Sequence, residues 1–227
     1  MQFRRYGVYY TPRPGALADF GAAWLGWDPV AGKSMAHPAI DGLPRDISEI
    51  TASPRRYGLH GTVKPPFYLA DGMGADDLSS NFESLCSKLA PIKLNGLVLA
   101  RLASFIALKI DGDQKRLANL ATTVVCELDS FRAPPSEAEV ARRRKANLSA
   151  SQKALLARWG YPYVLNEFRF HLTLTGRLGA DVEATLAALT PHFAPLLERP
   201  LEIDSLTLVG EDTNGMFHEF HRQTLTG

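Results

Sequence analysis

The chain has 227 residues, and with 45% of them hydrophobic it can bury the core of one large domain or of two small lobes. Its 25 lysine and arginine residues are balanced by 24 aspartate and glutamate residues, so it lacks the strong positive field that non-specific nucleic-acid binding requires. This balance excludes a histone-like or polybasic protein.

The first residues predict a strand and a helix rather than a targeting signal. Residues 3–10 alternate and are rich in aromatic side chains, and residues 16–25 follow with a helical pattern just after Pro14. The apolar stretch of a signal peptide is missing, and the longest apolar runs fall far short of the ~20 residues that cross a bilayer. We therefore expect a cytoplasmic protein that does not bind membranes.

Two similar groups of elements follow a loop-rich segment at 26–54. The first group is a strand at 57–64 that ends at Pro65-Pro66, a helix at 76–89, strands at 92–99 and 104–110, and a helix at 115–128. The second group is a strand at 168–175, a helix at 181–197, and strands at 201–209 and 217–225. Between the groups, a capping-box pattern at Ser136 predicts a basic helix through residues 142–145, and Ser149 or Ser151 begins another helix.

The order strand, helix, strand, strand thus occurs twice, which predicts an α+β fold of two pseudo-symmetric lobes. Short loops join the last two strands of each lobe, so we expect mainly antiparallel sheets with helices on their outer faces and an active-site cleft between the lobes. Residues 1–227 then form a single two-lobed domain. Its parts are a first motif lobe at about 50–130, a helical insertion at about 131–165 and a second motif lobe at about 166–227.

The two cysteines, Cys86 and Cys126, lie in apolar, helix-like stretches. Such a pair favours reduced thiols in a core over a disulfide framework or a zinc site. His218 and His221 have the spacing of a helical metal pair, but on a strand residues i and i+3 point to opposite faces. We expect no metal site.

Each motif lobe begins with a histidine, one intervening residue and a threonine: His60-Gly61-Thr62 and His171-Leu172-Thr173. Residues i and i+2 of a strand share a face, so each histidine points the same way as its threonine while the apolar neighbours face the core. One such match means little, but two matches at the starts of matched repeats are hard to obtain by chance. The alternative is a pair of structural histidines.

Two imidazoles and two hydroxyls that face each other across a cleft suit a phosphodiester. One neutral histidine can take a proton from an attacking water, and the other, as an imidazolium, can give a proton to the leaving oxygen. Each threonine hydroxyl can donate to a phosphoryl oxygen. This chemistry needs no metal ion or other cofactor, and the pseudo-symmetry leaves open which histidine is the base.

The residues around both motifs, 57–67 and 168–176, resemble the paired motifs of the 2H phosphoesterase superfamily. Residues 131–134 and 158–164 are similar to the bacterial branch of that superfamily that is encoded with phosphonate-degradation genes. The resemblance covers nearly the whole chain, although Gly61 stands where the superfamily usually has a hydrophobic residue. The resemblance implies a two-histidine cyclic phosphodiesterase with His60 and His171 as the acid and base.

The branch also implies a substrate, 5-phosphoribosyl 1,2-cyclic phosphate, whose ring opens to ribose 1,5-bisphosphate during phosphonate breakdown. Two alternatives remain open. A 2′,3′-cyclic phosphate at an RNA end or on a nucleotide would need a longer basic groove and aromatic stacking platforms, and the near-neutral charge makes long RNA the less favoured partner. A non-catalytic module that binds a nucleotide or a phosphorylated ligand would keep its affinity after the histidines are replaced.

Three basic residues are candidates for substrate binding. Lys64 lies two residues past Thr62 on the expected strand face, Arg169 has the mirrored position before His171, and Arg132 precedes two prolines. Each can pair with a substrate phosphate or lie in solvent. We expect the insertion at 131–165 to close over the substrate as a lid does.

Overall fold

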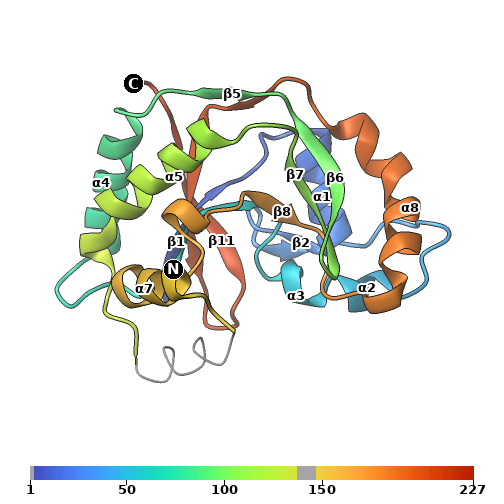
Figure 1. Cartoon of the computed structure of the whole chain (residues 1–227), viewed down its shortest axis with the longest axis horizontal. Helices are drawn as coiled ribbons and strands as arrows, with labels where there is room; N and C mark the ends of the chain where they lie inside the picture. The colour runs from blue at the N-terminus through green and yellow to red at the C-terminus, as the bar shows by residue number, and fades with distance from the viewer. Residues whose placement is uncertain (1–2, 137–146) are drawn as a thin grey trace.

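In a computed structural model of the protein, which describes residues 3–136 and 147–227, one antiparallel sheet forms the centre of the fold (Figure 1). Within those residues the sheet has seven strands in the order β11-β10-β1-β4-β8-β7-β6. The strands are β1 (Arg5–Tyr10), β4 (Gly61–Phe67), β6 (Leu97–Leu102), β7 (Phe105–Ile110), β8 (His171–Thr173), β10 (Ser205–Glu211) and β11 (Phe217–Thr224). Two short ribbons pair β2 (Trp27–Asp28) with β3 (Lys33–Ser34), and β5 (Ile92–Leu94) with β9 (Leu201–Ile203).

The sheet consists of two halves that meet at a single residue pair. β1 pairs along its length with β10 and β4, and β7 pairs with β6 and β8. Between the halves, β4 and β8 pair only where Gly61 lies opposite Leu172. Each half of the sheet combines strands from both ends of the chain, because β1 and β4 share one half with β10 and β11, and β8 lies beside β7 in the other.

Helices cover both halves of the sheet (Figure 1). α4 packs on β10 and β11, α5 packs on β4, and α8 packs on β6 and β7. The helix bounds are α1 Ala16–Leu25, α2 Ile47–Ile50, α3 Ala52–Arg55, α4 Ala75–Cys86, α5 Lys115–Glu127, α7 Ala150–Trp159 and α8 Val182–Phe193. The predicted α+β class and the antiparallel pairing are confirmed.

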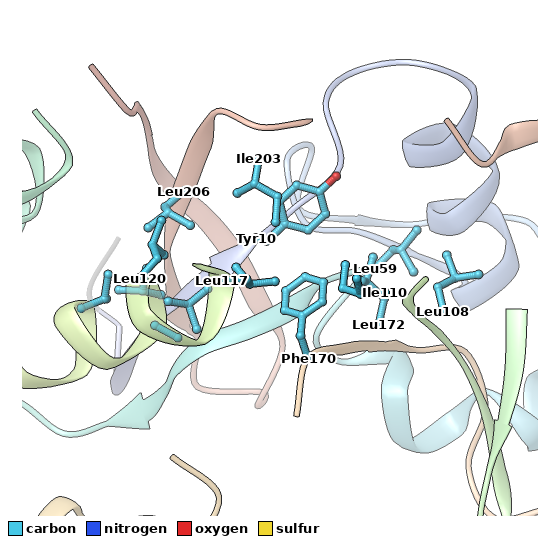
Figure 2. Packing of buried hydrophobic residues seen from close by; sticks show 14 of the residues in the cluster. Tyr10, Leu59, Leu108, Ile110, Leu117, Leu120, Phe170, Leu172, Ile203 and Leu206 are labelled. Carbon is cyan, nitrogen blue, oxygen red and sulfur yellow. The ribbon is translucent and has the colours of Figure 1, made fainter. Parts of the chain in front are cut away.

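One continuous hydrophobic core contains residues from both halves of the sheet. Phe170 lies at its centre, with Leu117 and Leu120 of α5 on one side and Leu59 and Leu172 on the other (Figure 2). All five side chains are less than a tenth exposed. The residues next to both histidines therefore fix the histidine-bearing segments to the same core.

β4 differs from the predicted strand because it continues through Pro65 and Pro66. Proline has no N–H to give to a neighbouring strand and is found at edges or bulges. The register between β1 and β4 shifts twice here, so that both prolines lie opposite Gly7. β8 does not reach this end of β4. Because of the bulge, and because β8 does not pair with this part of β4, no neighbouring strand requires the N–H groups that the two prolines lack.

Other predicted elements differ at their boundaries. The expected strands at 92–99 and 201–209 are each divided in two, at residues 95–96 and at Asp204. The loop-rich segment at 26–54 contains four short elements that its composition did not predict, β2, β3, α2 and α3. α7 follows a Ser149 capping box as expected, whereas the basic helix expected near 142–145 lies outside the described residues.

The cysteine prediction holds for one residue of the two. Cys86 is buried, but Cys126 is exposed on α5, because this helix turns only one face toward the core. Among the described residues, no helix is long and apolar enough to span a bilayer.

Candidate active site

The structure brings both His-x-Thr segments to one cavity of about 1160 Å³. His60, Thr62, His171 and Thr173 all lie in its lining. The pair of Gly61 with Leu172 joins the two segments directly beneath the cavity. Two segments more than a hundred residues apart in the chain therefore face the same space.

The local sequence explains why these four polar side chains face the cavity. Leu59 and Val63 are buried on either side of the first motif, and the second motif lies between the buried residues Phe170 and Leu174. Burial of the alternate apolar side chains turns the histidines and threonines to the opposite face. This arrangement agrees with the alternation in the sequence.

Gly61, which departs from the superfamily pattern, is needed for the approach of the two segments. A Cβ atom on Gly61 would lie 2.3 and 2.4 Å from two atoms of the Phe170 ring. Such distances are far shorter than a van der Waals contact. The missing side chain lets Phe170 pack against β4 and brings β8 to it.

The two imidazoles are held in the same way. His60 Nδ1 donates to the carbonyl of Gly58 at 3.0 Å, and His171 Nδ1 donates to the carbonyl of Arg169 at 2.8 Å. Because a carbonyl oxygen only accepts, each neutral ring carries its proton on Nδ1 and leaves the lone pair on Nε2. Each Nε2 can then accept a proton.

His60 is enclosed by aromatic side chains. The Tyr9 ring is stacked on it with centroids 4.0 Å apart, and the Tyr57 ring lies 5.5 Å away. Burial lowers the pKa of His60 from 6.5 to about 4, the hydrogen bond to Gly58 opposes this, and charge on His171 lowers it further. His60 is therefore neutral near pH 7, and its Nε2 accepts from the Thr62 hydroxyl at 3.1 Å.

Lys64 does not lie in this cavity, contrary to the prediction from strand alternation. The register of β1 against β4 shifts between Thr62 and Lys64, and this bulge reverses the facing of the lysine. Its side chain is 2% exposed, and Nζ donates to the carbonyl of Val125 at 3.0 Å and lies 3.7 Å from Asp129. Burial lowers the Lys64 pKa to about 8 although Asp129 opposes the shift.

Arg132 also lies away from the histidines. Its guanidinium donates to both carboxylate oxygens of Asp129, at 2.8 and 3.2 Å, and to the carbonyl of Arg158. It lines a small neighbouring pocket together with Lys64, and neither residue is among those that line the larger cavity. Of the three basic candidates, only Arg169 lines the cavity of the two histidines.

Several cavity residues were not identified in the sequence. Arg4, Arg5 and Arg56 line the cavity, as do Glu167 and Glu211. The aromatic side chains in the lining are Tyr9, Tyr57, Tyr68, Tyr161, Tyr163 and Phe168. Ser136, Tyr161 and Tyr163 belong to the insertion at 131–165. Alternation places Arg5 on the face of Tyr9, but the pairing of β1 with β4 that makes this face a cavity wall comes from distant parts of the chain.

Within residues 3–136 and 147–227, no three His, Cys, Asp or Glu side chains come together in an arrangement that could hold a metal ion. His218 and His221 have separate carboxylate partners. His218 Nε2 lies 3.0 Å from Asp212, and His221 Nε2 lies 3.5 Å from Glu83.

The fold and the cavity define an α+β protein with a paired-histidine site. Residues 62–218 match the family described as "Protein of unknown function (DUF1045)", and since this is more than half of the chain, the protein belongs to that family. The two His-x-Thr motifs carry its resemblance to the 2H phosphoesterase superfamily.

Two curated relatives are each named "Ribose 1,5-bisphosphate phosphokinase PhnN". The protein from Janthinobacterium sp. (strain Marseille) is 39% identical over 231 residues, which cover 98% of this chain and 51% of the relative. The protein from Laribacter hongkongensis (strain HLHK9) is 34% identical over 200 residues, covering 87% and 46%. The chain thus spans about half the length of these relatives.

Similar solved structures include TT0787 of Thermus thermophilus, with 14% identity, 98% of each chain covered and a TM-score of 0.47. E. coli LigT complexed with NADP+ has 13% identity over the full length of both chains and a TM-score of 0.46. Both TM-scores lie below 0.5.

Proposed function

We propose that this protein is a metal-independent cyclic phosphodiesterase that uses His60 and His171 as a general base and a general acid. The observation that carries the proposal is the matched pair of imidazoles in one cavity, each fixed by an Nδ1 bond to a carbonyl two residues earlier. This geometry leaves both Nε2 atoms for proton transfer. Thr62 and Thr173 supply hydroxyls beside them.

The lowered pKa of His60 supports its role as the base, because a histidine that is neutral at pH 7 can accept a proton. His60 Nε2 takes a proton from a water molecule as its oxygen forms a bond to phosphorus. The bond from phosphorus to one ring oxygen breaks, and protonated His171 gives its proton to that oxygen. Exchange with solvent then returns both histidines to their starting states.

The threonine hydroxyls donate to the non-bridging phosphoryl oxygens, on which negative charge accumulates. In the free site the Thr62 hydroxyl donates to His60 Nε2. Rotation of this hydroxyl toward the phosphate makes Nε2 available to water.

The names of the relatives support a particular substrate, 5-phosphoribosyl 1,2-cyclic phosphate. Opening its ring between phosphorus and the 2-oxygen yields ribose 1,5-bisphosphate, which is the compound in the name of both relatives. Each relative is about twice as long as the matched part. A protein with both the proposed ring-opening activity and the kinase activity in the relatives' name would form ribose 1,5-bisphosphate and then use it as the kinase substrate.

Phosphorus NMR of the EDTA-treated protein with this compound tests the proposal. Ring opening to ribose 1,5-bisphosphate is expected, and the His171→Ala protein should show none on the same time scale. Activity that disappears with EDTA and returns with a metal ion would overturn the metal-independent scheme. Tight binding without ring opening, retained in the His171→Ala protein, would indicate a non-catalytic binding module.

A second candidate is a 2′,3′-cyclic phosphodiesterase that acts on a nucleotide or an RNA end. Tyr68 and Tyr163 favour it, because these cavity residues are 47% and 46% exposed and could stack on a base. A 2′,3′-cyclic nucleotide in the same NMR experiment distinguishes the two substrates.

A further inference from the structure

The cavity contains more positive charge than carboxylate charge. Arg5 is neutralised by Glu211, to which it donates two hydrogen bonds of 2.5 and 2.6 Å. Arg4, Arg56 and Arg169 also line the cavity, and none of the described carboxylates forms an ion pair with any of them. An anion that enters here meets arginines whose charge is not already paired.

Arg56 is held by the side chain of Tyr57, whose ring lies near His60. Its guanidinium carbon lies 4.6 Å from the centre of the Tyr57 ring, and Nη2 donates to the Tyr57 hydroxyl. Tyr57 in turn stacks on Phe217 at 4.9 Å and lies 5.5 Å from the His60 ring. Cation–π contact and the hydrogen bond limit the orientations of the guanidinium.

The backbone anchors the same segment. The carbonyl of Arg56 accepts from the N–H of Phe217 at 2.7 Å, which joins residue 56 to the first residue of β11. The Arg56 side chain itself is exposed. A substitution of the side chain therefore keeps this backbone bond and removes little buried surface.

Arg169 is held differently. Its Nη1 donates to the carbonyls of Phe168 and Asn166, and its own carbonyl fixes His171. This places Arg169 at the His171 segment, whereas Arg56 is linked through Tyr57 to His60. The guanidinium groups of Arg56 and Arg169 are thus each linked to a different histidine of the cavity.

We propose that Arg56 binds a second, non-reacting phosphate of the substrate and makes the site specific for sugar cyclic phosphates that carry a phosphomonoester. A phosphomonoester near pH 7 has a charge of about −1.5 to −2 and presents three acceptor oxygens. A planar guanidinium can donate to two of them at once. The inference rests on the proposed function and deepens it by assigning the residue that recognises the substrate class.

The kinetic test compares 5-phosphoribosyl 1,2-cyclic phosphate with ribose 1,2-cyclic phosphate, which lacks the second phosphate. Arg56→Gln should lower kcat/KM for the phosphorylated compound by about 10- to 100-fold, mainly through KM, and leave the other compound unchanged. Arg56→Lys should restore part of the loss. Arg101→Gln is the matched control, since it removes an exposed arginine whose partner is Glu183, outside the cavity.

A binding test separates this inference from the proposed reaction. Calorimetry with ribose 5-phosphate should show binding to the wild type and to Arg101→Gln, and weaker binding of about 10-fold or more to Arg56→Gln. Equal binding to all three proteins, or an equal loss of activity on both cyclic compounds, would overturn the role of Arg56. Failure of the wild type to open either compound would overturn the proposed function, while the calorimetry would still decide the Arg56 site.

Discussion

The segments around His60 and His171 follow one sequence pattern but differ in their surroundings. The His60 ring stacks on Tyr9 at 4.0 Å and accepts from Thr62, whereas the nearest aromatic contact of His171 is Phe105, at 5.8 Å and tilted by 50°. Among the described residues, no hydrogen bond joins His171 to Thr173. Two similar motifs therefore hold their histidines in different surroundings, because neighbouring elements and not the motifs decide what packs against each ring.

Replacement of either histidine should have the largest effect. His60→Ala and His171→Ala are each expected to lower kcat by about 10²–10⁴-fold, and the double variant should be much less impaired than the product of the two losses, since both act in one step. Initial rates from phosphorus NMR provide the measurement. His192→Ala is the control, because His192 stacks on Phe20 outside the cavity. Losses that multiply fully would show that the two rings act independently.

A methyl group between the two segments should have the next largest effect. Gly61→Ala should lower kcat by about 10- to 100-fold, because the new Cβ pushes Phe170 and with it β8 away from His60. Adding Phe170→Leu, which lacks the two outer ring atoms that the Cβ meets, should recover part of the activity. Thermal unfolding of each variant separates this effect from loss of stability. A double variant no more active than Gly61→Ala would contradict the steric explanation.

The pH dependence of activity and of stability should report the burial of the His60 ring. With its pKa lowered to about 4 by burial, His60 stays neutral at pH 5.5. The general base is then still available, so protonation of His60 should not lower kcat/KM at that pH. The His60 contribution to stability should be complete above pH 6.5 and disappear as the pH falls to about 4, because the unfolded chain binds the proton first. NMR titration of the His60 ring, assigned with His60→Gln, measures this directly. A midpoint near 6.5 would show that the ring is solvated.

Lys64→Met should have the smallest effect on catalysis. It leaves the Val125 carbonyl without its donor, so the free energy of unfolding should fall by about 1–3 kcal/mol, while kcat/KM stays within about twofold. Denaturant unfolding and steady-state kinetics provide the two measurements. Arg169→Gln, at the mirrored position before His171, should instead lower kcat/KM because Arg169 lines the cavity. A large loss of activity with normal stability in Lys64→Met would place the lysine at the substrate.

Local patterns in the sequence predicted much of the fold and the four motif residues of the cavity. Alternation fixed which residues of 59–63 and 170–174 are buried, and this depends on neighbours in the chain. The position of Lys64 could not be predicted, because one bulge against β1 reverses the alternation. Arg56 was missed because its place in the cavity depends on Tyr57 and on contact with β11, about 160 residues further along the chain.

The interleaved strand order has a consequence for dividing the chain. β1 comes from the first part of the chain and pairs with β10 from the last part, and β8 comes from the last part and pairs with β4 and β7 from the first. Pieces ending at Ser136 and beginning at Leu148 would each leave strand edges and core side chains uncovered. Neither piece should therefore fold alone. When the two pieces are co-expressed, they should reassemble into an active complex by fragment complementation.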